Sequence, residues 1–479
     1  MSSDRITKEN SDNYALFVLL RTFTPDEWKE FEKFIASPYF NKGRNYLPFV
    51  KILKKYHPGY DKEKLSKENI YKKLFPGKVY KESVISSMFS RLYNLGEEFL
   101  IHFEFNKENN IKKEIIAIGA LNSRKLKSKA LKRATKAENM INGSAVGKDH
   151  YLIKKLYYTE LGYFHYYNEN RHQLYDIFNL ILDNIFYSFL IEFSHTDSSM
   201  LAHKISWKSD HENSLITKMT DHIDFDKIFE LIRKEDKIEY PFIRISYLMY
   251  KAIKNLENDD HYFELKELTY ANFNKLDYSY RKQILNTLAL ICNLKFINGK
   301  NDFKVEAFEI KKNAIENDLF EKTGNHIKID EFRSVFLEAL NVNQIKWAEE
   351  FAEKYNVKLS PQVRKDVLNY CKARIAFENS EFDKAIEHIM EVNINHIAFK
   401  IDMKNLLAKI YYETNSTESL HSLLNTYYQL LNNSGFQIEE LALRHFNFIK
   451  YLKNILKIKE NFKSNSEFEI LKKAFYLKM

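Results

Sequence analysis

Cysteine, glycine and proline are scarce in this sequence of 479 residues, and each scarcity excludes a class of protein. The two cysteines, Cys292 and Cys371, are too few for a disulfide framework or a thiolate zinc site. Both lie among apolar residues in helical patterns, so we predict that they are buried. With 11 glycines and 7 prolines, the chain has too few turn residues for a β-rich fold of this size. We therefore predict an all-α protein.

Targeting signals and long apolar runs are also missing. The early apolar run at residues 14–20 is too short to cross a bilayer, and residues 1–5 lack the order of a signal peptide. We expect a cytoplasmic protein that does not insert into a membrane.

Aromatic residues are abundant, with 31 Tyr and 37 Phe, and large flat rings suit the grooves between packed helices. Charge is unevenly distributed. Residues 1–150 hold 29 basic and 18 acidic residues, a net of +11, and the remainder holds 45 and 47, a net of −2. This asymmetry favours an anionic partner for the N-terminal third, although lysine-rich helical surfaces are often only solvated.

The prolines separate a short-helix region from a long-helix region. Five of the seven precede residue 80, which predicts short helices with sharp ends. Thr24 followed by Pro25 and Glu27 is typical of a capped helix start. A basic amphipathic helix is predicted at 121–141, and the small residues that follow it indicate a boundary. We predict a basic helical domain at 1–141, a linker at 142–150 and a repeat region at 151–479.

The repeat region is indicated by a spacing of 35 to 37 residues. Three pairs of neighbours, Trp347-Ala348, Lys384-Ala385 and Ser419-Leu420, recur at that interval, as do Phe336, Ala373 and Ala408 on the preceding helices. Together with Tyr158, Leu161 and Gly162, this pattern resembles the tetratricopeptide-repeat family.

The resemblance implies an α-α superhelical array whose concave surface holds a peptide or protein segment. Basic and amide side chains on that surface suit carboxylates or carbonyls, and tyrosines suit apolar groups. Taking Phe336, Ala373 and Ala408 as packing positions directs seven residues towards it: Arg333, Asn341, Tyr370, Arg374, Asn405, Lys409 and Tyr412. An equally simple interpretation is that these residues are the exposed stripe of amphipathic helices.

No catalytic or metal-binding motif survives a test of its spacing. Gly143 to Lys148 lacks one residue of a phosphate loop, and Asp149 stands where Ser or Thr must hold magnesium. The histidines and aspartates of segment 194–226, which we predict to be a long loop or frayed connection as far as 224, lack the spacing of metal ligands. Asp224 is better explained as a helix cap. We expect no enzyme activity, no cofactor and no metal, and the favoured function is a protein-interaction scaffold.

The alternative hypothesis is a nucleic-acid-binding regulator, in which the repeats act as a sensor or oligomerisation module. Residues 65–92 resemble the helix-turn-helix of winged-helix regulators, some of which place a tetratricopeptide-like module after the DNA-binding domain. The likeness would direct Lys78, Lys81, Ser86, Ser87 and Arg91 to DNA. Helices precede the motif where that family has strands, and no alternating hairpin follows residue 95 to form a wing.

The basic helix at 121–141 is a second candidate for an anionic partner. Its cationic residues could contact RNA phosphates, an acidic protein or an anionic membrane, or could simply be solvated. The residues concerned are Arg124, Lys125, Lys132, Arg133 and Lys136.

Overall fold

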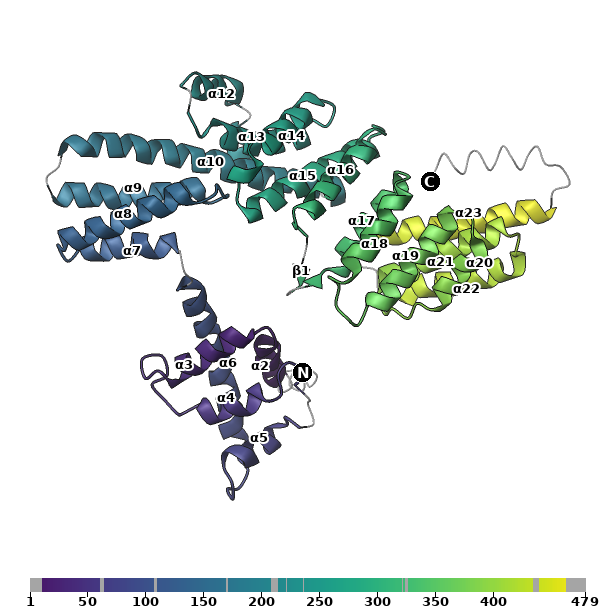
Figure 1. Cartoon of the computed structure of the whole chain (residues 1–479), viewed down its shortest axis with the longest axis horizontal. Helices are drawn as coiled ribbons and strands as arrows, with labels where there is room; N and C mark the ends of the chain where they lie inside the picture. The colour runs from purple at the N-terminus through teal and green to yellow at the C-terminus, as the bar shows by residue number, and fades with distance from the viewer. Residues whose placement is uncertain are drawn as a thin grey trace. The chain divides into compact units, whose positions relative to one another are not determined.

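The computed structural model describes residues 11–60, 64–106, 110–168, 171–207, 214–220, 222–235, 237–320, 322–323, 326–433 and 439–461. Within these ranges the regular secondary structure is helical apart from a hairpin of two-residue strands, β1 (Lys322–Thr323) and β2 (His326–Ile327). The predicted all-α fold is therefore confirmed (Figure 1).

The chain divides into two compact units, which are described separately. Unit 1 comprises Met1–Ser144 and Asp149–Ser188, and unit 2 comprises Ala145–Lys148 and Phe189–Met479. Within unit 2, Val146 exchanges backbone hydrogen bonds with the segment at 275–277, at 2.7 and 3.0 Å.

From Ser11 onward, the described residues of unit 1 first form a head of five helices. Their shortness follows from the prolines, because a proline cannot continue an established helix. The capping box predicted at Thr24 is present: its side chain accepts a hydrogen bond from the Glu27 amide, and the Glu27 carboxylate accepts one from the Thr24 amide. The head helices are α2 (Ser11–Arg21), α3 (Pro25–Ala36), α4 (Leu47–Lys54), α5 (Lys67–Leu74) and α6 (Glu82–Phe105).

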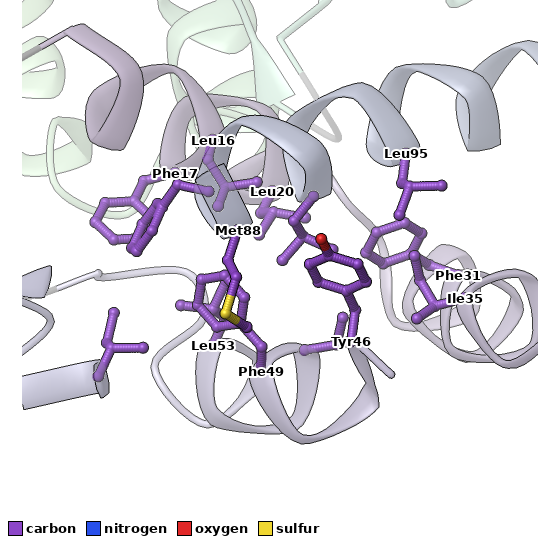
Figure 2. Close-up of a cluster of buried hydrophobic side chains, with 14 of the residues drawn as sticks. Leu16, Phe17, Leu20, Phe31, Ile35, Tyr46, Phe49, Leu53, Met88 and Leu95 are labelled. Carbon is purple, nitrogen blue, oxygen red and sulfur yellow. The ribbon is translucent and has the colours of Figure 1, made fainter. Parts of the chain in front are cut away.

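The head helices share one apolar core (Figure 2). Leu16 and Leu20 of α2 and Leu95 of α6 belong to it, and all three are fully buried. Aromatic rings fill the space between α3 and α6, where the ring centres of Phe31 and Phe99 are 5.2 Å apart. Burial of such large rings accounts for the stability of a region built from short helices.

Three further helices of unit 1, α7 (Ile111–Asn122), α8 (Lys127–Gly143) and α9 (His150–Tyr167), pack against one another. The apolar face predicted for the basic helix is buried at four positions: Ala130, Ala134, Ala137 and Ile141.

The prediction of one continuous helix at 121–141 is wrong. Lys125 adopts a left-handed conformation with φ of 57°, and the Leu126 amide donates to the Leu121 carbonyl at 3.0 Å. This is the arrangement that ends helices in a Schellman motif, so α7 stops before α8 begins. Leu126 and Leu131 would lie on the buried apolar face if 121–141 were one helix, but they are 47% and 50% exposed.

The long helix α10 (Arg171–Trp207) crosses the division between the units. It contradicts the predicted loop at 194–224, because the helix continues to Trp207. Its polar residues are accommodated locally: Asp197 is buried and accepts a hydrogen bond from Thr217 at 2.7 Å. Buried polar residues of this kind interrupt the apolar pattern of the helix, so the helix could not be recognised from the sequence. The Asp224 cap is confirmed, since its side chain accepts from the Lys227 amide.

The remaining helices of unit 2 pack mainly on their neighbours in sequence, and α19 also contacts α21 (Figure 1). The six recurring positions at 336, 348, 373, 385, 408 and 420 are all fully buried, as expected of packing positions. We call these six positions the packing seam. The helices are α11 (Leu215–Thr220), α12 (Phe225–Lys234), α13 (Tyr240–Lys254), α14 (Asp260–Ala271), the 3-10 turn η1 (Phe273–Lys275), α15 (Tyr278–Ile297), α16 (Phe303–Glu316), α17 (Ile329–Asn341), α18 (Ile345–Asn356), α19 (Arg364–Glu378), α20 (Phe382–Met390), α21 (Ile397–Glu413), α22 (Thr417–Asn433) and α23 (Glu439–Asn461).

Candidate functional site

The seven residues predicted for a peptide-binding surface all lie on α17, α19 and α21, the first helices of three successive pairs. We call α17–α22 the helix-pair region. In the structure, several of these side chains form hydrogen bonds with other side chains of the protein that the sequence did not reveal.

Arg333 is held by a carboxylate that sequence reasoning missed. Its Nε and Nη2 donate hydrogen bonds to the two oxygens of Asp402, at 2.5 and 2.7 Å. Tyr370 donates to the same carboxylate at 2.7 Å and is 1% exposed, so its predicted position on an open surface is wrong. Burial and the neighbouring Asp402 raise the pKa of Tyr370 well above its usual value. The three side chains form a closed network that joins α17, α19 and α21.

Asn405 has a similar internal role. Its side-chain oxygen accepts a hydrogen bond from Tyr427 of α22 at 2.9 Å, and the same hydroxyl lies 2.9 Å from Nδ1 of His445. Burial lowers the pKa of His445. Tyr412 lies under the ammonium group of Lys459, 5.6 Å from its ring centre. Asn341, at the end of α17, is exposed.

Arg374 and Lys409 differ from the others because their charges are poorly neutralised. The Arg374 side chain is 14% exposed, and its buried Nε has no hydrogen-bond partner among the described residues. The nearest carboxylate, that of Glu378, is 3.9 Å away. Burial lowers the pKa of Lys409, and the positive charge of Arg374 lowers it further. The two cations are thus near enough to repel each other, and the one ion pair of Arg374 is long.

The packing seam explains why these two cations meet. Ala373 and Ala408 are fully buried, and each directly precedes one of the cations. Small side chains let α19 and α21 approach closely, so the next residues of the two helices come within electrostatic range.

The head contains the two helices of the predicted helix-turn-helix, α5 and α6, which contact each other. Lys78 and Lys81, between and at the start of these helices, are exposed. Ser87 is also exposed, whereas Ser86 and Arg91 are half-buried, and Arg91 lies 3.7 Å from Glu98. Beyond residue 95, α6 continues to Phe105 in place of the strands of a wing.

The cationic residues at 124–136 fall into two groups. Arg124 and Lys125 lie in the turn before α8, where Arg124 donates to the Ala120 carbonyl at 2.7 Å. Lys132, Arg133 and Lys136 are exposed on α8 itself. Sequence reasoning missed Glu114 of α7, which accepts hydrogen bonds from two of these three, as described below.

Neither cysteine is placed for chemistry. Both are buried as predicted, and burial raises the pKa of Cys292 to about 12. Over the ranges that the structure describes, no group of three His, Cys, Asp or Glu side chains could hold a metal ion. Asp210, His211 and Asp221 of the segment singled out in the sequence lie outside the described residues.

One part of α10, His172–Lys204, is long and apolar enough to cross a membrane by length and composition, and 28% of its most apolar stretch is buried. Core helices of soluble proteins pass the same test, so this feature carries little weight.

Comparison with protein-family models, curated proteins and solved structures finds no match for this chain.

Proposed function

We propose that this protein is a non-enzymatic interaction scaffold that binds a peptide or protein segment at the helix-pair region. Arg374 and Lys409 would receive a carboxylate of the partner. The observation that carries this proposal is the pair of poorly neutralised, half-buried cations on adjacent helices.

The physical argument concerns the cost of unpaired charge. A buried guanidinium N–H without a hydrogen-bond partner is destabilising, and a second cation nearby adds repulsion. A carboxylate between the two would supply charge-assisted hydrogen bonds and neutralise both. Arg333 is already satisfied by Asp402, so it does not compete for the ligand.

The test uses the full chain and a peptide library displayed with free C-terminal carboxylates, beside the same library as amides. We expect selection of carboxylate-bearing peptides and a loss of about tenfold in affinity for Arg374→Gln or Lys409→Met, which keep most of each side chain's packing. Lys372→Met, an exposed position on the same helix, is the matched control. Unchanged binding by the two variants, or an equal loss in the control, would contradict the proposal.

A nucleic-acid-binding regulator is the second candidate, because Lys78 and Lys81 are exposed at the α5–α6 hairpin. Phosphate contacts would make DNA affinity fall steeply with salt. A salt-sensitive gel shift that is abolished by Lys78→Glu with Lys81→Glu would favour this candidate over the scaffold.

A further inference from the structure

The positive charge of the N-terminal third is concentrated beyond the head. Residues 1–106 hold 18 basic and 14 acidic residues, a net of +4, whereas residues 107–150 hold 11 and 4, a net of +7. Most of the excess therefore belongs to the segment that contains α7 and α8, and any electrostatic partner of this segment must be acidic.

A groove of about 1020 Å³ runs along this cationic face of α8. Lys129, Lys132, Arg133 and Lys136 line it, and Leu121 of α7 and Met140 of α8 contribute apolar surface. From Lys129 to Lys136 the helix rises about 10 Å, so the four cations form one row at helical spacing.

One buried carboxylate partly neutralises this row. Glu114 is 4% exposed, and it accepts hydrogen bonds from Arg133 at 2.7 and 2.9 Å and from Lys136 at 2.7 Å. Two cations share that single anion. Lys129 and Lys132 are exposed and form no ion pair or hydrogen bond with any residue that the structure describes. Arg133 and Lys136 are thereby fixed in position, while the other two remain available.

The lining of the groove distinguishes between acidic partners. It contains no aromatic ring on which bases could stack. Leu121 and Met140 offer contacts that a sugar–phosphate backbone cannot use, whereas an apolar side chain fits them well, methionine being adaptable in shape. A helix with carboxylates three, four and seven residues apart matches the row of cations in both length and sign.

We infer that the α8 groove is a docking site for an acidic amphipathic helix of a protein partner. Carboxylates of the partner pair with Lys129 and Lys132 at the rim, and an apolar side chain lies against Leu121 and Met140. This site is independent of the one proposed on α19 and α21, so either can fail without the other.

The experiment measures fluorescence anisotropy of an 18-residue helical peptide with Glu on one stripe and Leu on the adjacent stripe, added to the full chain. Three comparison probes are a peptide of the same composition in scrambled order, a DNA duplex and vesicles of anionic phospholipid. We expect the designed helix to bind more tightly than the scrambled peptide, and Lys129→Glu with Lys132→Glu to weaken it about tenfold or more.

Lys125→Glu with Lys127→Glu provides the same change of charge outside the groove lining and should alter affinity by less than about twofold. Met140→Gln tests the apolar floor without a charge change, and it should also weaken the designed helix. Circular dichroism verifies that each variant is folded. An equal effect of the two lysine pairs, equal binding of the scrambled peptide, or a preference for the duplex or the vesicles would overturn the inference.

Discussion

The helix-pair region and α8 both display rows of cations, yet they use them differently. In the helix-pair region, Arg333 is joined to Asp402 by two short hydrogen bonds, and Glu338 of α17 pairs with Lys311 of the preceding helix, α16. On α8, cations outnumber the available carboxylates, and Glu114 alone serves two of them. A cation in a sequence is therefore a candidate for ligand binding only if the structure shows that no internal carboxylate neutralises it.

The first prediction tests whether the paired cation Arg333 contributes more to stability than a cation on α8, and it removes Asp402. Asp402→Asn leaves the half-buried Arg333 without a counter-charge, so we expect the free energy of unfolding to fall by about 3 kcal/mol. Urea denaturation followed by circular dichroism measures it. Lys132→Met on α8 removes a charge with no internal partner and should change stability by less than about 0.5 kcal/mol.

A second variant shows whether the Asp402 effect comes from the unpaired charge. Arg333→Met combined with Asp402→Leu removes both charges and should recover part of the lost stability. If the double variant is as unstable as Asp402→Asn, the network stabilises the fold through side-chain packing and not through charge pairing. The difference from α8 would then not be electrostatic.

A second prediction concerns Glu114 of α7, which neutralises two cations of α8 as Asp402 neutralises Arg333. Burial raises the pKa of Glu114, but hydrogen bonds from Lys136 and Arg133 outweigh it, so the pKa lies below its usual value. A lowered carboxyl pKa stabilises the fold above the unfolded-state pKa, and that contribution is lost as pH falls through the folded-state value. We expect Glu114→Gln to cost about 2 kcal/mol at pH 7.

The measurement for Glu114 is urea denaturation of wild type and variant between pH 7 and pH 3. The difference between them should shrink as the pH falls below about 4, because the wild-type carboxyl becomes protonated. A difference that stays constant across this range would show that the ion pairs do not stabilise α7 on α8.

Local and distant contacts differ in how well the sequence predicts them. The Thr24 cap joins residues three apart, and the positions of the packing seam recur at intervals of 35 and 37 residues, so both could be predicted. Arg333 and Asp402 are 69 positions apart, and nothing in the neighbouring residues of either one indicates the other. The burial of Tyr370 was missed for the same reason, since its hydroxyl is satisfied by that distant carboxylate.

The turn at 123–126 shows a different limit. The residue that ends α7 in a left-handed conformation is Lys125. Glycine or asparagine usually marks such a position, so the break could not be predicted from the residue type. The surplus of charge on α8 was visible, but the buried Glu114 that fixes two of its cations was not.

A third prediction sharpens the contrast between local and distant polar contacts. Thr24→Ala removes a capping side chain that is exposed and replaceable by water, so we expect a loss of about 1 kcal/mol, well below that of Asp402→Asn. Thermal unfolding of both variants under one condition gives the comparison. Equal losses would mean that burial does not control the cost of a broken polar contact here.

The smallest expected effect has the opposite sign and concerns Lys409, the residue of the helix-pair region that most resembles those on α8. Because burial and Arg374 lower its pKa, the charged ammonium is less favourable in the folded chain than in the unfolded chain. Lys409→Met should therefore be neutral or stabilising by about 1 kcal/mol at pH 7, even though the proposed carboxylate binding is lost.

The sign of the pH dependence provides the check on Lys409. Between the lowered pKa and the usual lysine value, the unfolded chain binds more protons than the folded chain, so the contribution of Lys409 to stability rises with pH. The advantage of Lys409→Met over wild type should accordingly shrink between pH 7 and pH 10 in paired urea titrations, which cancel the shared titration of the tyrosines. A residue that costs stability at neutral pH and is needed for carboxylate binding acts as a ligand group. If Lys409→Met instead destabilises the chain strongly at pH 7, the cation is a structural element like Arg333, and the scaffold proposal loses the observation that carries it.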